Sequence, residues 1–172
     1  LELSYNSPYS GQFSWAASFQ RTQEGISGYA SLYGLDLTYF PSQQFKLSFN
    51  NNVRISDDWL IGTGQGQLAQ YSRKLWGSHL NLSGALTSDV ELSVNLQWSL
   101  LEARDKKLFE LTDRNLTSIS SPDKGFNDSR VSAQVRLRYN IGPSSDIYLV
   151  YARNGADISQ TNLLPDGGSD NW

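Results

Sequence analysis

His79 is the only histidine of the chain, and it is the first residue to consider as a catalytic group. A catalytic histidine needs a nucleophile beside it and a carboxylate that orients its ring. Serine, aspartate and glutamate residues are plentiful, but no spacing ties any of them to His79. We therefore interpret His79 as a polar wall residue and predict that the chain is not an enzyme.

Glu91, Arg136 and Arg138 form a second candidate group, because they lie near the turn ends of two segments that we expect to pair. We predict an ion pair between Glu91 and one of the two arginines. Its structural interpretation is a cross-strand pair. Its functional interpretation is part of a charged ring that tunes solute selectivity. We favour the structural one.

Two further motifs carry less chemical information. The glycine-rich stretch from Gly62 to Gly66 lacks the Gly-Lys-Ser/Thr ending of a phosphate-binding loop, so we interpret it as a loop or a strand bend. Asp113, Asp123 and Asp128 do not have the spacing of a calcium-binding EF-hand loop, and solvated carboxylates are the better interpretation. The chain has no cysteine and therefore neither a disulfide framework nor a thiolate metal site. We predict no bound metal and no cofactor.

The elements that would position these residues are clearest at 131–141, where every odd residue is apolar and every even residue is polar. A period of two places alternate side chains on opposite faces of a β-strand. The segment 142–145 then predicts a turn, and 146–153 a returning strand. Long strands with one apolar and one wet face are typical of membrane-spanning β-barrels.

The same alternation, extended over the chain, predicts eight antiparallel strands in up-and-down order. All five prolines fall between these segments, as expected for a residue that cannot donate to a β-ladder. The predicted strands cover 1–6, 12–20, 29–39, 45–55, a segment ending at 86, 90–100, 131–141 and 146–153.

Short connections alternate with longer ones along this segmentation. Turns at 7–10, 40–42, 87–89 and 142–145 alternate with connections at 21–28, about 55–66 and 103–129, and with a loop-like tail at 154–172. Outer-membrane barrels sort short turns and long loops onto opposite rims in this way.

The alternation also assigns side chains to the two sides of a barrel wall. Four aromatic residues near short turns and four roughly ten positions away predict two lipid-facing girdles, about one hydrocarbon thickness apart. The residues assigned to the girdles are Tyr5, Tyr39 and Tyr139 at one level and Phe19, Trp76 and Trp98 at the other, and Phe45 and Tyr29 lie at the same two levels. The predicted lumen-facing polar residues are Lys46, Arg54, His79, Glu91, Arg136 and Arg138.

Composition excludes several other classes. The 172 residues suffice for one domain, and a net charge of −3 without a basic patch argues against nucleic-acid binding. No run approaches the roughly 18 apolar residues of a membrane helix. The mean hydropathy of −0.45 is typical of soluble proteins, but the wet faces of barrel strands lower this average in the same way.

An even strand number would place residues 1 and 172 both on the side of the long connections. We therefore expect an internal part of a larger barrel, which additional strands or other chains complete. The alternatives are a closed eight-stranded barrel with inverted termini and a miscounted strand between residues 56 and 86.

Two stretches resemble a known family. Residues 87–94 (Thr-Ser-Asp-Val-Glu-Leu-Ser-Val) are similar to its recurring Thr-Pro-Asp-Leu-Ser-Leu turn, with Ser88 in place of the proline. Residues 136–151 resemble its near-C-terminal hairpin. The family comprises uncharacterised outer-membrane proteins with a carbohydrate-binding-module-like N-terminal domain and a large C-terminal β-barrel. The resemblance covers roughly residues 60–155, and it implies the late part of such a barrel without assigning catalytic residues.

The sequence thus predicts an all-β fold, an antiparallel up-and-down transmembrane β-barrel segment in a bacterial outer membrane. Its expected partners are membrane lipid and lipopolysaccharide. The expected function is a passive channel, transporter or export conduit. The alternatives are a membrane anchor or surface-binding scaffold, a soluble all-β binding module and, ranked lowest, an outer-membrane hydrolase.

Overall fold

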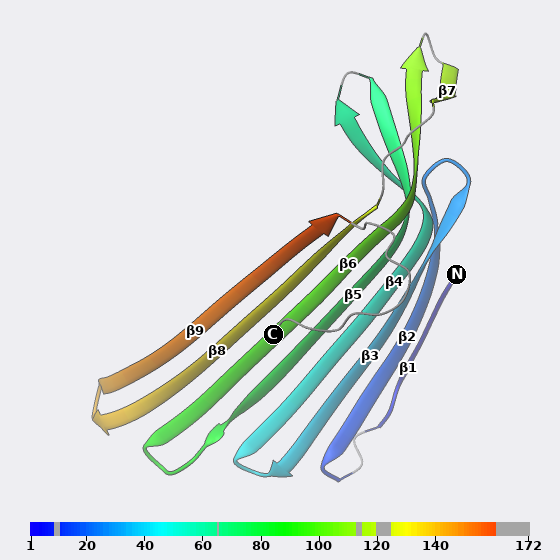
Figure 1. Ribbon diagram of the computed structural model, residues 1–172. Helices are drawn as coiled ribbons and strands as arrows, with labels where there is room; N and C mark the ends of the chain where they lie inside the picture. The colour runs from blue at the N-terminus through cyan, green and yellow to red at the C-terminus, as the bar shows by residue number, and fades with distance from the viewer. Residues whose placement is uncertain (9–10, 65, 113–114, 120–124, 161–172) are drawn as a thin grey trace, which may run out of the picture.

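The computed structural model describes residues 1–8, 11–64, 66–112, 115–119 and 125–160, which form one antiparallel β-sheet (Figure 1). This part of the chain contains no helix that is long and apolar enough to cross a bilayer. The nine strands are β1 (Glu2–Asn6), β2 (Phe13–Glu24), β3 (Gly28–Ser42), β4 (Phe45–Gly64), β5 (Gln67–Ala85), β6 (Val90–Thr112), β7 (Asn115–Ile119), β8 (Phe126–Gly142) and β9 (Ser145–Gln160).

The strand order follows the chain. Eight strands lie side by side in the order β1-β2-β3-β4-β5-β6-β8-β9, and β7 pairs only with the far end of β6. Each of the eight predicted segments falls in a separate strand of this path, so the all-β antiparallel prediction is confirmed. The alternation did not predict β7.

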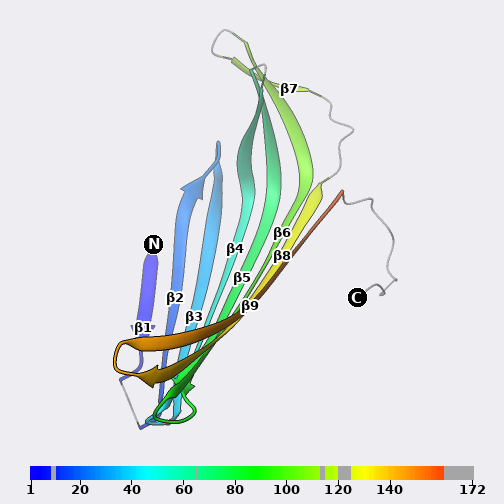
Figure 2. The ribbon, with the colours of Figure 1, turned by 90° about the vertical axis from the view of Figure 1, so that its left-hand side faces the viewer.

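The described sheet is open. Its path ends at β1 on one side and β9 on the other, and these two strands do not pair with each other. In profile the sheet is curved rather than flat (Figure 2). What the structure shows is therefore a curved antiparallel sheet.

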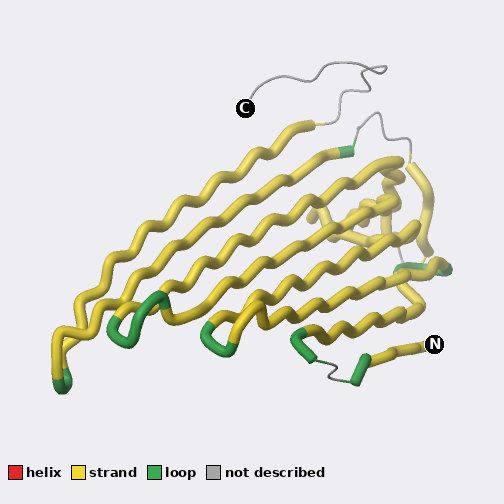
Figure 3. Tube along the Cα trace, turned by 90° about the horizontal axis from the view of Figure 1, so that it is seen from below, coloured by secondary structure: helices red, strands yellow, loops and turns green. Residues whose placement is uncertain are grey.

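The tight connections lie together at one rim of the sheet, which we call the turn rim (Figure 3). This rim carries residues 7–8 and 11–12 between β1 and β2, and the connections at 43–44, 86–89 and 143–144. At the opposite rim, residues 57–64 of β4, 67–71 of β5, 104–112 of β6 and 115–119 of β7 continue past the sheet. We call these residues the extension, and Figure 1 shows it above the main sheet.

Two predicted loops are wrong in their boundaries. Residues 55–66 are mostly strand, because β4 runs to Gly64 and β5 begins at Gln67. In 103–129, β6 continues to Thr112, β7 follows, and β8 begins at Phe126. Register shifts near Ser56 and Gln70 displace the side-chain alternation, so that a period of two no longer marks the strands.

The predicted tail and the 21–28 loop are also shorter than expected. β9 continues to Gln160, and residues 161–172 lie outside the described part of the chain. β2 extends to Glu24 and β3 begins at Gly28, which leaves a three-residue turn.

The sheet has one apolar and one polar face, and neither is covered by another layer of described residues. Apolar side chains from even positions of β5 and β6 and from odd positions of β8 share the apolar face through direct pairs such as Leu82–Val94 and Val94–Val135. Leu149 on this face remains 68% exposed. Among the described apolar residues, the buried ones are Ala30, Ala69, Tyr71 and Ala103.

Candidate functional site

All six residues predicted to face a lumen lie on the polar face. The register pairs Lys46 with Ser83, Ser83 with Ser93, and Ser93 with Arg136, so these side chains form one row across four strands. The same alternation along each strand adds Arg54, His79, Glu91 and Arg138 to this face. The structure thus brings these residues onto one surface, while its identity as a lumen stays a prediction.

The ion pair predicted for Glu91 is confirmed. Arg138 Nη1 lies 3.1 Å from Glu91 Oε2, and Arg138 Nη2 lies 3.1 Å from Asp146 Oδ2. Arg136 instead places its guanidinium 4.5 Å from the centre of the Tyr148 ring, a cation–π contact. Glu91, Arg138 and Asp146 therefore tie β6, β8 and β9 together near the turn rim.

His79 is surrounded by amides. It pairs across the sheet with Asn50 on β4 and Gln97 on β6, and Asn81 donates to Asn95 Oδ1 at 2.6 Å one row away. Neither a carboxylate nor a hydroxyl group of the described residues hydrogen-bonds to His79. This surrounding suits a hydrated wall.

Of the three acidic residues considered for a calcium site, Asp128 lies in the described part of the chain. Asp128 pairs with Arg130 on its own strand, with Nη2 and Oδ2 2.7 Å apart. Asp113 and Asp123 lie outside the described residues. Within the described ranges, no group of three metal-ligating side chains is close enough to hold an ion.

The six predicted girdle residues all lie on the apolar face, and their rows run obliquely across the strands. Through successive direct pairs, Tyr139 on β8 aligns with Val90 of β6, Tyr39 on β3 with Val94, and Tyr5 on β1 with Trp98. The tyrosines nearest the turn rim therefore climb along the strands from β8 to β1.

The size of this displacement gives a strand tilt. From Val90 to Trp98 is eight residues of β6, roughly 26 Å, and β8 to β1 spans six strand spacings, roughly 29 Å. If the three tyrosines lie at one level, the strands are tilted by about 40° from the perpendicular to that level. This tilt is within the range of transmembrane barrels.

The second girdle follows this line less closely. The rings of Trp98 and Trp76 are in contact, with centres 4.6 Å apart and planes inclined by 57°, and Trp76 pairs with Leu100, two residues nearer the extension than Trp98. Phe19 aligns with Trp76 through Tyr33 and Val53, which places it inside the oblique band rather than at its edge. Tyr29, four residues beyond Tyr33 on β3, lies at that edge.

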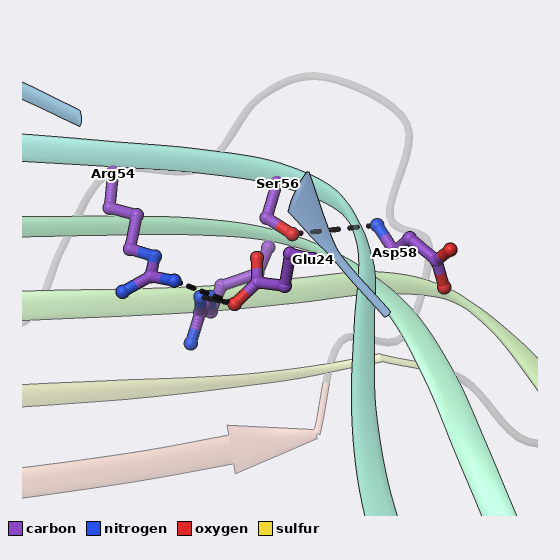
Figure 4. Close-up of polar contacts among 5 residues, drawn as sticks. Glu24, Arg54, Ser56 and Asp58 are labelled. Atoms are coloured by element: carbon purple, nitrogen blue, oxygen red, sulfur yellow. Dashed lines mark hydrogen bonds and ion pairs between the residues drawn. The ribbon is translucent and has the colours of Figure 1, made fainter. Parts of the chain in front are cut away.

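An ion cluster at the extension side of the polar face was not predicted as a unit. Glu24 Oε1 accepts hydrogen bonds from Arg54 Nη2 at 2.8 Å and from Arg73 Nη2 at 2.7 Å (Figure 4). The side chains of Glu24 and Arg73 are 16% and 10% exposed. Arg54 was expected on this face, but nothing in the sequence indicates that Glu24, 30 residues away, would be its partner.

The cluster of Glu24, Arg54 and Arg73 has a net charge of +1, and this charge affects the pKa of Arg73. Burial lowers the pKa of the Arg73 guanidinium, Glu24 raises it in part, and Arg54 lowers it further, so that the net direction is down. The Arg73 guanidinium also lies 4.6 Å from the Trp59 ring centre. Glu24 therefore offsets the repulsion between the guanidinium groups of Arg54 and Arg73.

Replacing Glu24 by Gln is expected to lower the free energy of unfolding by about 1–3 kcal/mol, because two partly buried guanidinium groups lose their anion. Equilibrium unfolding in detergent measures the change. Glu2→Gln, at an exposed position of β1, is the matched control and should have no effect. Equal stability of the two variants would contradict a stabilising role for Glu24.

Asp58 was also missed, and it is the most strongly held polar group of the rim. Its Oδ2 accepts hydrogen bonds from the N–H groups of Ile26, Ser27 and Gly28 at 2.8, 2.8 and 2.9 Å. Its Oδ1 accepts from Gln70 Nε2 at 2.5 Å. Asp58 is 3% exposed, so this carboxylate joins the β2–β3 turn to the base of the extension.

The environment of Asp58 changes its acidity. Burial raises the pKa of the carboxyl group, but the hydrogen bonds from Ser27, Gln70, Gly28 and Ile26 outweigh burial and hold the pKa below its ordinary value. The β2–β3 turn fits closely around this carboxylate. A Cβ on Gly25, which has φ +71°, would lie only 2.0 Å from the Asp58 carbonyl oxygen.

Aromatic packing on the same rim shows which way the sheet curves. The rings of Trp59 on β4 and Phe126 on β8 are 6.4 Å apart, with Tyr71 of β5 in contact with both. Because β5 and β6 separate these strands, a flat sheet would place such rings about 14 Å apart. The sheet is therefore concave toward its polar face at this rim.

Comparisons with known proteins add no relative: the chain matches no protein-family model, no curated protein and no solved structure.

Proposed function

We propose that this chain is a wall segment of an outer-membrane β-barrel that acts as a passive channel or export conduit, and that it is not an enzyme. The observation that carries the proposal is the two-faced sheet, apolar on one face and polar on the other, with the polar face concave at the extension rim and no second layer among the described residues. A water-soluble sandwich would bury the apolar face instead.

The oblique aromatic rows support the same proposal. A bilayer imposes level boundaries on strands that tilt, so interfacial aromatic residues must shift along successive strands. The shift from Tyr139 through Tyr39 to Tyr5 has this form. The spanning parts would then run from the turn rim to the level of Trp98 and Trp76, and the extension would project beyond the membrane.

The polar lining supports a passive mechanism. The Ser, Asn and Gln side chains of the concave face, with His79 and Lys46 among them, would keep a lumen hydrated and select solutes by size and charge. Strands from outside the described sheet would complete the wall along the unpaired edges of β1 and β9. We also propose that the chain belongs to the family of uncharacterised outer-membrane proteins that residues 60–155 resemble.

A role as an anchor or surface scaffold is the second candidate, and the extension favours it. Paired strands of β4, β5, β6 and β7 continue past the rim and present a folded surface there. Such a surface could hold a glycan or another protein at the outer face without any transport.

Reconstitution of the intact protein separates the two candidates. Purified protein added to planar bilayers is expected to give stepwise ohmic conductance if the lumen is open. Arg136→Glu, which reverses a charge on the polar face, should shift the cation-to-anion permeability ratio, whereas Lys74→Glu on the other face is its control. Stable insertion without conductance would favour the scaffold, and failure to enter lipid would refute both candidates.

A further inference from the structure

A hollow on the polar face near the turn rim is the starting point of this inference. It lies across β5, β6, β8 and β9 and has a volume of about 390 Å³, a size typical of small-molecule sites. Its lining combines the small side chains of Ser83, Ala85 and Ser93 with the larger ones of Arg136 and Tyr148. Because small side chains lie beside large ones on neighbouring strands, the surface is hollowed at this point.

Arg136 is the cation of this hollow that no carboxylate neutralises within the described part of the chain. Its guanidinium carbon lies 4.5 Å from the centre of the Tyr148 ring, and its side chain makes no ion pair or hydrogen bond with another described residue. The contact with Tyr148 uses the face of the ring, so it gives the guanidinium N–H groups no oxygen acceptor. These donors are therefore free to bind an oxyanion in the hollow.

The other charged groups near the hollow are already paired. Arg138 contacts Glu91 and Asp146, with one carboxylate at each of its terminal nitrogens. Glu91 stays 59% exposed and keeps a negative charge at the edge of the hollow. With Arg136 included, two cations and two carboxylates sum to zero charge. A ligand with one negative charge would thus meet little repulsion at Arg136, whereas a dianion would be repelled twice as strongly by Glu91.

Two serine hydroxyl groups supply further hydrogen-bonding capacity. Ser93 lies directly opposite Arg136, and Ser83 lies directly opposite Ser93 on the next strand. Both serines are half-buried, and neither side chain makes a hydrogen bond with another described residue. A hydroxyl group can donate to a carboxylate oxygen or accept from a hydroxyl group of a ligand. The hollow thus combines one free cation with two neutral groups that suit a polar organic molecule.

We propose that this hollow binds the carboxylate of a small organic monoanion. The fork of N–H groups of the Arg136 guanidinium donates to the two carboxylate oxygens, and the polar remainder of the molecule contacts Ser83 and Ser93. The site rests on the proposed function for its supply of solute, since a hydrated lumen would bring such molecules to Arg136. It narrows the solutes of the proposed channel to small monocarboxylates.

Saturation-transfer NMR of lactate with the intact protein in detergent micelles tests the site without requiring a channel. Lactate carries one carboxylate and one hydroxyl group, and its polarity keeps it out of the micelle interior. Arg136→Gln is expected to weaken lactate binding roughly tenfold, because charge-assisted hydrogen bonds are lost. Arg130→Gln, on the same face of β8 and roughly 20 Å away, removes the same charge and should leave the affinity unchanged.

Sulfate, a dianion, tests the charge balance of the hollow in the same experiment. It should displace lactate poorly from the parent protein, because Glu91 repels the second negative charge. Glu91→Gln removes that charge while Asp146 keeps its contact with Arg138. This variant should strengthen sulfate binding roughly threefold and lactate binding by less.

The possible outcomes separate the site from the proposed function. An absence of lactate binding, equal weakening by Arg136→Gln and Arg130→Gln, or tighter binding of sulfate than of lactate would each overturn the site. Planar bilayers then test the channel. Conductance that lactate reduces in the parent but not in Arg136→Gln would support both. Lactate binding that depends on Arg136, without any conductance, would refute the channel and keep the site, whereas conductance without such binding would refute the site and keep the channel.

Discussion

Leu96→Arg is expected to lower the free energy of unfolding of the vesicle-inserted protein by about 2–4 kcal/mol, although the same variant should have little effect on the sheet in water. Leu96 lies on the apolar face, midway between Val90 and Glu102, and is 41% exposed, so its replacement removes little packing. An arginine at the middle of the hydrocarbon layer costs about 2–4 kcal/mol. Urea titration of protein folded into vesicles measures this cost directly.

Gln97→Arg provides the matched control for this experiment. Gln97 is the next residue of β6, is also exposed, and points to the polar face. The added charge would meet water in a lumen, so the free energy of unfolding in vesicles should stay within about 0.5 kcal/mol of the parent. Similar losses for both variants would mean that the two faces have the same environment, contrary to the proposed wall.

Asp58→Ala is expected to destabilise the protein by about 3–5 kcal/mol. The substitution leaves three backbone N–H groups and the Gln70 amide without their acceptor in a buried site. It should also release the β2–β3 turn, which hydrogen exchange of Ile26, Ser27 and Gly28 would report. Asp57→Ala is the control, because Asp57 is exposed and adjacent in sequence.

The same carboxylate makes stability depend on pH in a predictable direction. Because folding lowers the pKa of Asp58, its contribution is fully present above the unfolded-state pKa of about 3.9 and is lost as the pH falls through the folded-state pKa. The difference in unfolding free energy between the parent and Asp58→Asn should therefore shrink below pH 4. A difference that stayed constant down to pH 2 would contradict this linkage.

The sequence was sufficient to predict the sheet wherever one face is apolar. In β8 the alternation from Val131 to Ile141 fixes both the strand and the direction of each side chain, and Glu91 with Arg138 followed from it. A shift of one residue would move every apolar side chain to the other face, so the register there is strongly determined.

The sequence was not sufficient at the extension rim. Residues such as Asp58 lie at register shifts, where a period of two carries no information. The partners of Asp58 at 26–28 come from another hairpin, and no local pattern connects them. Asn51 shows the opposite failure, since it lies on the apolar face and donates to Ser78 Oγ at 2.7 Å, a polar pair that alternation alone would exclude.

The strand order of the sheet bears on how the chain reaches its fold. Every neighbour along the path is the next strand in the chain, except where β7 separates β6 from β8. Contact order is therefore low for an all-β protein, and each pair of neighbouring strands except β6 and β8 is joined by a short connection. Assembly can proceed by zippering outward from any one hairpin, with each new strand adding to an edge that its predecessor has already formed.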